Sequence, residues 1–169
     1  KSIKKLGKEN WGFLLFILLM LASRSSLADW YQIPSGSMLP TIEVGDRVFV
    51  DKMAYRLEVP FTDISLMETG QPQRGDIVVF MSKAADERLI KRVIGIPGDS
   101  VSMVNNQLVM NGQVINYKLS GEQNFYQENL LGFEHLVQFV KVPDPRDTFN
   151  NIVIPEGFIF VMGDNRNNS

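Results

Sequence analysis

Short strand-like stretches separated by turn residues run through most of this chain, and they restrict its fold more than any other feature. From Ile33 onward, segments rich in Val, Ile and Phe alternate with Gly, Asn, Asp and Pro, at the spacing typical of antiparallel β proteins. No alternation of strand and helix patterns points to a parallel sheet. The sequence therefore predicts a mainly β fold made of antiparallel sheets.

The segment from Ser100 to Asn116 shows this pattern most clearly. Asn105-Asn106 and Asn111-Gly112 each join two short apolar runs, and such pairs favour tight hairpin turns. We therefore expect a three-stranded meander here. Further strands are predicted at residues 47–51, 76–81, 88–94 and 157–162.

Residues 120–151 are more polar and contain Pro143-Asp144-Pro145-Arg146. Prolines and short polar side chains favour turns and loops. We interpret this segment as an inserted, partly irregular lobe of the same domain.

Composition restricts the possible chemistry. With 169 residues, 44% of them hydrophobic, the chain has material for one globular domain. A net charge of -2, with no run of Lys and Arg beyond the first eight residues, disfavours a nucleic-acid partner. The chain has no cysteine and one histidine, His135, so we expect no thiol nucleophile, no metal site and no cofactor. We assign His135 no role beyond packing.

The N-terminal segment has the order of a membrane anchor. Residues 1–10 carry four lysines, and an unbroken apolar run from Trp11 to Ala22 follows. A helix continued to Asp29 would bring Trp30 about 28 Å from Trp11, close to the thickness of a bilayer core. We predict a cytoplasmic segment at 1–10, a transmembrane anchor at 11–29 and an extracytoplasmic domain at 30–169, in the inner membrane of a bacterium.

Two other interpretations of this segment stay open. Ser26-Leu27-Ala28 also fits a cleavable signal peptide with cleavage after Ala28, and an apolar helix of this length also occurs in protein cores. Because the chain starts at Lys1 and stops at Ser169 within a polar cluster, we interpret it as cut at both ends.

The segment Ile33–Thr41 could present a nucleophile. Pro34 and Pro40 restrict the backbone, and Gly36 can take angles forbidden to other residues, so a hydroxyl of Ser37 could be held in a fixed pose. Taken alone, the segment is also typical of an ordinary turn. A serine attacks only when a base takes its proton, and the single histidine lies in an unpromising segment.

Lys91 is the alternative base. It lies in an apolar strand, with Leu89 and Val93 on the same face. Burial disfavours an ammonium ion, so a desolvated lysine can act as a neutral general base near pH 7. The other interpretation is an edge-strand lysine that reaches solvent.

Taken together, three ordered motifs resemble those of bacterial type I signal peptidases. They are Ser-Gly-Ser-Met-Leu-Pro-Thr at 35–41, Lys-Arg-Val-Ile-Gly-Ile-Pro-Gly-Asp at 91–99, and Gly-Asp-Asn-Arg-Asn-Asn-Ser at 163–169. The resemblance implies a membrane-bound endopeptidase of the signal-peptidase fold that cleaves secretory preproteins after small-x-small sites. It implies Ser37 as nucleophile, Lys91 as general base, Ser35 in the oxyanion hole and Ser169 orienting the lysine amine.

The same resemblance suggests roles for neighbouring residues. Arg92, Asp164 and Arg166 look structural, holding the C-terminal loop near the site. Asn167 departs from the family, whose third motif usually has aspartate there, and this puts any salt bridge from that position in doubt. Shallow apolar pockets for small substrate side chains are expected from Ile33, Met38, Ile42, Leu89 and Ile90.

Substrate is expected to bind as an added strand near Leu89–Lys91, and the lipid bilayer is the second expected partner. Two other functions stay open. One is a related Ser-Lys peptidase with another substrate, such as a conjugal pilin or a self-cleaving repressor. The other is a membrane-tethered module that binds exported polypeptides without cutting them.

Overall fold

The computed structural model describes every residue except 1–9, 27, 59–64, 122–123, 140–147 and 169. Within the described residues, the paired strands of the three- and four-stranded sheets are antiparallel, which confirms the predicted mainly β fold. The chain forms two compact units, one from residues 1–31 and 47–71 and the other from residues 32–46 and 72–169. The predicted site residues belong to the second unit, and Ser169 lies outside the described residues.

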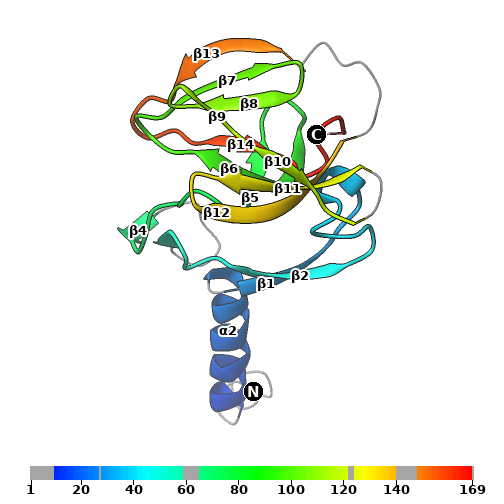
Figure 1. Ribbon diagram of the computed structural model, residues 1–169. Helices are drawn as coiled ribbons and strands as arrows, with labels where there is room; N and C mark the ends of the chain where they lie inside the picture. Colours follow the sequence, from blue (N-terminus) through cyan, green and yellow to red (C-terminus); the bar gives the residue numbers. More distant parts are fainter. Residues whose placement is uncertain (1–9, 27, 59–64, 122–123, 140–147, 169) are drawn as a thin grey trace. The chain divides into compact units, whose positions relative to one another are not determined.

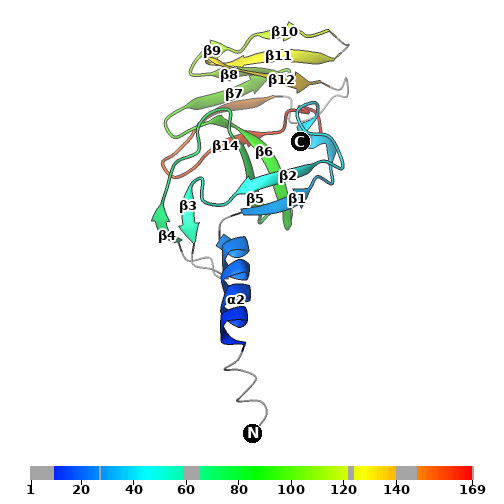
Figure 2. The same cartoon turned by 90° about the horizontal axis from the view of Figure 1, so that it is seen from below.

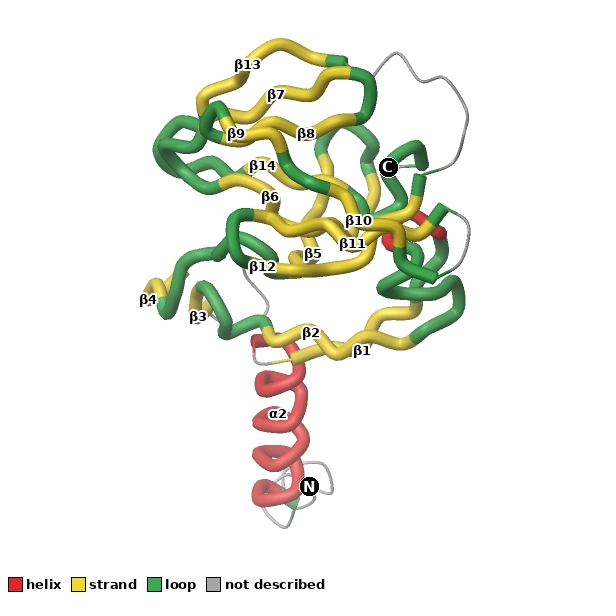
Figure 3. Tube along the Cα trace, in the orientation of Figure 1, coloured by secondary structure: helices red, strands yellow, loops and turns green. Residues whose placement is uncertain are grey.

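The described residues of the first unit form one helix and four strands. Helix α2 (Trp11–Ser26) is followed by β1 (Ala28–Gln32), which pairs with β2 (Arg47–Asp51), and β3 (Arg56–Glu58) pairs with β4 (Ser65–Glu68). Figure 3 shows α2 as the long helix of the chain.

Helix α2 is shorter than predicted. It ends at Ser26 and β1 begins at Ala28, so residues 28 and 29 are strand instead of helix. The ring of Trp30 packs edge-on against Phe49 of β2, with centroids 5.2 Å apart, and such cross-strand aromatic pairs stabilise a sheet. Of the helices within the described residues, none is both long and apolar enough to cross a bilayer.

In the second unit, the part of the chain that the structure describes forms a short 3-10 turn and three sheets (Figure 1). The turn is η1 (Gly36–Met38). The sheets have the orders β14-β6-β5, β13-β7-β8-β9 and β10-β11-β12. The strands are β5 (Ile77–Ser82), β6 (Glu87–Gly95), β7 (Ser100–Val104), β8 (Gln107–Met110), β9 (Gln113–Val114), β10 (Tyr117–Leu119), β11 (Phe125–Leu130), β12 (Phe133–Gln138), β13 (Phe149–Val153) and β14 (Phe160–Met162).

The predicted meander is confirmed in β7, β8 and β9. These strands pair in sequence order, and the two turns contain the expected left-handed residues. The φ angles are 48° and 64° at Asn105 and Asn106, and 51° and 75° at Asn111 and Gly112. Asparagine and glycine tolerate this conformation, and its twist matches that of the flanking strands.

Two predicted segments differ from the structure. Strand β14 starts at Phe160 instead of 157, because Gly157 has a φ of 79° and the N–H of Phe158 donates to the Pro155 carbonyl in a turn. The lobe at 120–151 is more regular than predicted. It contains the hairpin of β11 and β12 (Figure 2), and its last strand, β13, pairs with β7. Residues 143–146 lie outside the described residues.

The described residues of the second unit contain an apolar core, to which the meander, β6 and β11 each contribute side chains. Its center is made of fully or nearly fully buried residues. These residues are Ile94, Val101, Met103, Leu108, Met110, Ile115, Leu130 and Ile154. Because β6 enters this core through Ile94, the three residues before it in that strand are held in a fixed position at the core's edge.

Candidate active site

The segment that carries Ser37 is held by backbone hydrogen bonds at both of its ends. The N–H of Ile33 donates to the Asp46 carbonyl, and the N–H of Gly45 donates to the Ile33 carbonyl, each at 2.9 Å. Within the segment, η1 is anchored by Met38, which is 1% exposed, whereas Ser37 is half-buried and Ser35 is exposed. The turn therefore leaves the two serines closer to the surface than the methionine that anchors it.

Gly36 does not use the left-handed freedom that the sequence analysis expected of it. Its φ is not positive, and it begins the 3-10 turn in an ordinary conformation. A methyl group added there would lie 3.0 Å from Cδ1 of Leu39, so the close approach of that side chain is the main restriction. Ser35, just before the turn, is extended, with φ -134° and ψ 154°.

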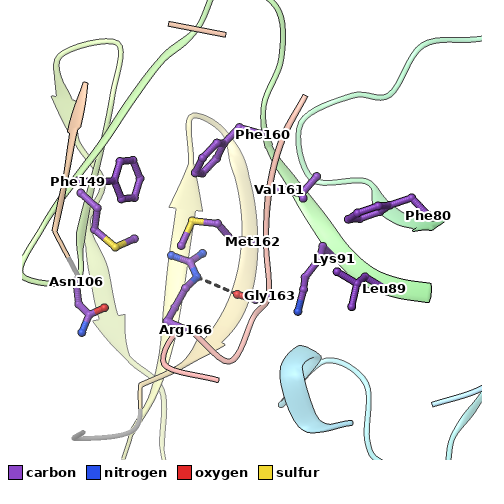
Figure 4. A pocket seen from close by; sticks show the side chains of 11 residues that line it. Phe80, Leu89, Lys91, Asn106, Phe149, Phe160, Val161, Met162, Gly163 and Arg166 are labelled. Atoms are coloured by element: carbon purple, nitrogen blue, oxygen red, sulfur yellow. Dashed lines mark hydrogen bonds between the residues drawn. The ribbon is translucent and has the colours of Figure 1, made fainter. Parts of the chain in front are cut away.

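Lys91 is buried at the edge of the core. It is 9% exposed and pairs across the sheet with Val78 of β5. The next residue, Arg92, pairs with both Ile77 of β5 and Met162 of β14. Turn η1 packs against β6, and in Figure 4 the Lys91 side chain runs from β6 towards this blue turn. The structure thus places the predicted base beside the segment that carries the predicted nucleophile.

A cavity of about 310 Å³ adjoins Lys91 and is lined mainly by apolar side chains (Figure 4). Of the five predicted pocket residues, Leu89 lines it. Ile33, Met38 and Ile42 are buried at 4%, 1% and 9% exposure and do not line it, nor does Ile90. The lining residues are Phe80, Leu89, Lys91, Met103, Asn106, Phe149, Phe160, Val161, Met162, Gly163 and Arg166.

A buried ion pair joins β6 to the C-terminal loop. The Arg92 guanidinium donates to both carboxylate oxygens of Asp164, from Nε at 2.8 Å and from Nη2 at 2.7 Å, and these side chains are 4% and 0% exposed. Nη1 of Arg92 donates to the Gly75 carbonyl at 2.7 Å. The Thr41 hydroxyl also donates to Asp164. Asp164 therefore contacts both Arg92, on the strand of Lys91, and Thr41, in the segment that carries Ser37.

Arg166 makes a second buried ion pair, with a partner that the sequence analysis did not identify. Its Nη2 donates to Oε1 of Glu128 at 2.7 Å, and both side chains are fully buried. Nη1 donates to the Tyr117 hydroxyl at 3.3 Å and Nε to the Gly163 carbonyl at 3.2 Å. Arg166 therefore ties the loop to β11, whereas Asp164 ties it to Arg92.

His135 lies between the two ion pairs, a place that its sequence context did not indicate. Its Nε2 is 3.4 Å from Oε1 of Glu128 and 3.7 Å from Oδ1 of Asp164. Burial lowers the pKa of His135 to about 4, and the positive charges of Arg92 and Arg166 act in the same direction against the two carboxylates. The imidazole is therefore neutral near pH 7.

The lowered pKa of His135 predicts a loss of stability in acid. Between about pH 6.5 and about pH 4 the unfolded chain binds this proton and the folded chain does not, so the folded state loses on the order of 3 kcal/mol as the pH falls through that range. His135→Gln, which cannot titrate, should lose less stability over the same range in urea unfolding. Since His135 is the only histidine, the difference between the two curves isolates its contribution. Parallel curves would contradict the prediction.

The loop that follows β14 also contacts η1 directly. The backbone N–H of Asn165 donates to the Ser37 carbonyl at 3.1 Å, and its side-chain Nδ2 donates to the Gly36 carbonyl, also at 3.1 Å. Gln138 of β12 holds the loop from the other side, because its N–H donates to the Asp164 carbonyl and its carbonyl accepts from the Arg166 N–H. Asn165 and Gln138 were not among the predicted site residues.

Comparisons with known proteins agree with this arrangement. Residues 8–169 match the family described as signal peptidase, peptidase S26. Signal peptidase I of Pseudomonas aeruginosa is 42% identical over 99% of this chain and 64% of that protein, and signal peptidase I of Pseudomonas fluorescens is 37% identical over the same shares. The chain thus spans slightly less than two thirds of the length of these relatives.

A solved structure of a signal peptidase I from Enterococcus faecalis V583 matches with 28% identity. The match covers 57% of this chain and 80% of that chain, with a TM-score of 0.33, which is too low to support a conclusion about the fold. Family membership rests instead on the sequence match, which takes in all three motifs. The chain belongs to the signal peptidase family, peptidase S26.

Proposed function

We propose that this protein is a serine endopeptidase that removes signal peptides from exported preproteins after small-x-small sites. The observation that carries the proposal is a buried lysine, Lys91, on the strand against which the turn of Ser37 packs. A serine needs a base to attack a peptide carbonyl, and a neutral amine in a poorly solvated position can be that base. The family relationship supports the same assignment.

In the proposed mechanism Ser37 Oγ attacks the scissile carbonyl carbon while its proton passes to the Lys91 amine. The carbonyl π electrons move to oxygen, and the resulting oxyanion accepts hydrogen bonds from the Ser37 N–H and the Ser35 hydroxyl. Collapse breaks the C–N bond, and Lys91 returns the proton to the leaving amine. Water then attacks the acyl-enzyme with Lys91 again as base. Ser169 is proposed to orient the lysine amine.

Substrate is proposed to add to the sheet as a strand along β6. Over Glu87–Arg92 this strand pairs with β5 on one side, and on the other side β14 pairs with it only from Arg92 onward. No described strand pairs with β6 on that side before Arg92, and this is where we propose that an extended peptide adds. Leu89, in this stretch, lines the cavity beside Lys91. The predicted pocket residues Ile33, Met38 and Ile42 are buried, so we propose that they shape this surface from beneath, while half-buried Ile90 extends it along β6.

Cleavage of a preprotein by the purified protein, compared with Ser37→Ala, tests the proposal. We expect the wild type to cut a preprotein with an Ala-x-Ala site, and Ser37→Ala to lose at least about 10³-fold in rate because no other nucleophile replaces the hydroxyl. Equal activity of the two proteins would eliminate Ser37 as nucleophile. Failure of the wild type to cut would favour a module that only binds exported polypeptides.

Ser35→Ala tests the proposed oxyanion hole. Loss of one donor should lower kcat by roughly 10- to 1000-fold with little change in KM, because the hydrogen bond strengthens only as charge develops on oxygen. The exposed Ser35 leaves room for this substitution without disturbing packing. An unchanged kcat would remove Ser35 from the mechanism.

We also propose that the N-terminal segment that includes α2 anchors the protein in a bacterial inner membrane, with the catalytic unit outside the cytoplasm. Apart from half-buried Ile17, the large apolar side chains of α2 are exposed in the structure, from 44% at Leu15 to 70% at Trp11, and exposed apolar surface of this kind is stabilised by contact with lipid. The lysines that precede Trp11 favour a cytoplasmic N-terminus.

The protein should fractionate with membranes in high salt, and its catalytic unit should be digested by protease only from outside. Recovery of a soluble form beginning at Asp29 would overturn this.

A further inference from the structure

Asn165 contacts the turn of Ser37 through both its backbone and its side chain. Its N–H donates to the Ser37 carbonyl and its Nδ2 to the Gly36 carbonyl, each at 3.1 Å, and the residue is 4% exposed. The Gly36 carbonyl and the N–H of Ser37 belong to one peptide group, whereas the Ser37 carbonyl belongs to the next. Both peptide groups that flank the nucleophile are therefore held at their carbonyl ends by one residue.

A peptide group is planar, so its carbonyl and its N–H point in opposite directions and turn together. The Gly36 carbonyl accepts a second hydrogen bond, from the N–H of Leu39 at 3.2 Å. Two donors at this oxygen prevent the plane from rotating and so determine the direction of the Ser37 N–H at its far side. Hydrogen bonds accepted by a carbonyl also polarise the amide and strengthen the N–H as a donor.

The amide of Asn165 has only one acceptable orientation towards this turn. Its Oδ1 has no hydrogen-bond partner among the described residues, so nothing on that side compensates for a flip of the amide. A flipped amide would place Oδ1 against the Gly36 carbonyl oxygen, which is also an acceptor. Nδ2 is therefore kept on the Gly36 side by the turn itself.

We propose that Asn165 is a positioning residue that aims the backbone N–H of Ser37 at the oxyanion. The inference rests on the function proposed above, because it is that reaction which places negative charge next to this N–H. Asn165 touches neither substrate nor the reacting atoms, and it acts through the peptide group of Gly36. Its neighbour Asp164 is bonded to Arg92 and Thr41 instead, so the two residues of the loop have separate tasks.

The test compares Asn165→Ala and Asn165→Asp with the wild-type protein purified in detergent. Aspartate has the shape of asparagine but puts an acceptor where Nδ2 donates. For both variants we expect kcat to fall about 10- to 100-fold while KM changes less than about twofold. The reason is that a misdirected Ser37 N–H stabilises the transition state less, whereas binding of the substrate in the ground state hardly changes. Asn111→Ala is the matched control. It also loses two side-chain hydrogen bonds, one donated to Asp99 and one accepted from the Ser100 N–H, and should reduce thermal stability without lowering kcat.

A ligand that forms an oxyanion on reaction with Ser37 distinguishes a misdirected Ser37 N–H from a general distortion of the binding site. A small-x-small peptide ending in a trifluoromethyl ketone accepts Ser37 Oγ at its carbonyl carbon, the π pair becomes an oxyanion, and the serine proton passes to Lys91. Its affinity should fall by the same factor as kcat, and the affinity of the corresponding alcohol, which cannot accept the serine, should stay unchanged.

Three results would overturn the inference. The first is a normal kcat in both variants, and the second is an equal loss of affinity for ketone and alcohol. The third is an inactive wild-type protein, which would overturn the proposed function as well and is thereby distinguished from the other two. If Asn165→Ala does not fold, the isosteric Asn165→Asp supplies the same comparison.

Discussion

Replacing Lys91 with arginine should abolish preprotein cleavage while leaving the protein folded. Arginine keeps the positive charge and a similar reach, but it does not give up its proton, so it cannot accept one from Ser37. Loss of a general base lowers the rate by about 10² to 10⁴-fold. The burial of Lys91 makes the substitution informative, because a lysine at 9% exposure is not merely an exposed charge on the sheet.

The control is Lys118→Arg, at an exposed position of strand β10 in the same unit, which should cleave like the wild type. Rates are measured on an Ala-x-Ala preprotein in detergent, and folding is checked by circular dichroism. Activity of the wild type should also rise with pH as the lysine amine loses its proton. A folded Lys91→Arg protein that cleaves at close to the wild-type rate would exclude the Ser-Lys mechanism.

Local turn chemistry made the meander of β7, β8 and β9 predictable. Asn105-Asn106 and Asn111-Gly112 are pairs that tolerate positive φ, and all four residues have it. The register follows from two-residue turns of this kind. In contrast, the end of α2 was predicted wrongly, because pairing of β1 with β2 depends on residues almost twenty positions later in the sequence and no local signal at Ala28 reports it.

Long-range contacts also explain which parts of the site the sequence could not reveal. The motifs bring Ser37 and Lys91 to attention, but Glu128 lies in none of them, and its partner Arg166 is 38 residues away. A signal was present in β11, where Glu128 and Leu130 alternate as buried positions. A glutamate on the buried face of a strand requires a cation, and the only way to choose Arg166 from the sequence would be to know the fold.

The lining of the apolar pocket is a second feature that could not be predicted from the sequence. Apolar side chains near a nucleophile are equally compatible with core and with binding surface. Met38 and Ile33 are almost fully buried, whereas Phe80 and Val161, far from Ser37 in sequence, line the cavity next to Lys91. Sequence proximity to Ser37 therefore did not identify the lining residues, because antiparallel pairing brings distant strands to the same edge.

The second large effect is expected from Asp164→Ala, in the buried pair with Arg92. Removing the carboxylate leaves the guanidinium charged, 4% exposed and without its counter-charge, and breaking such a pair destabilises a protein by about 3 to 5 kcal/mol. A domain has only about 5 to 15 kcal/mol in total, so this single change should shift the urea midpoint strongly. The Thr41 hydroxyl loses its acceptor at the same time.

The double variant Arg92→Met with Asp164→Ala decides whether charge is the cause. Methionine fills part of the space of arginine without a charge, so the double variant leaves no buried ion behind. Removing both partners should therefore destabilise the protein less than the sum of the two single substitutions. The free energy of unfolding of all four proteins is measured in urea at one pH. Additive losses, or a loss below about 1 kcal/mol for Asp164→Ala, would mean that this pair does not hold the loop to β6. With the expected coupling, the Arg92–Asp164 pair fixes the C-terminal loop to β6. Because the Thr41 hydroxyl donates to Asp164, the same pair then holds the segment of Ser37 close to the strand of Lys91.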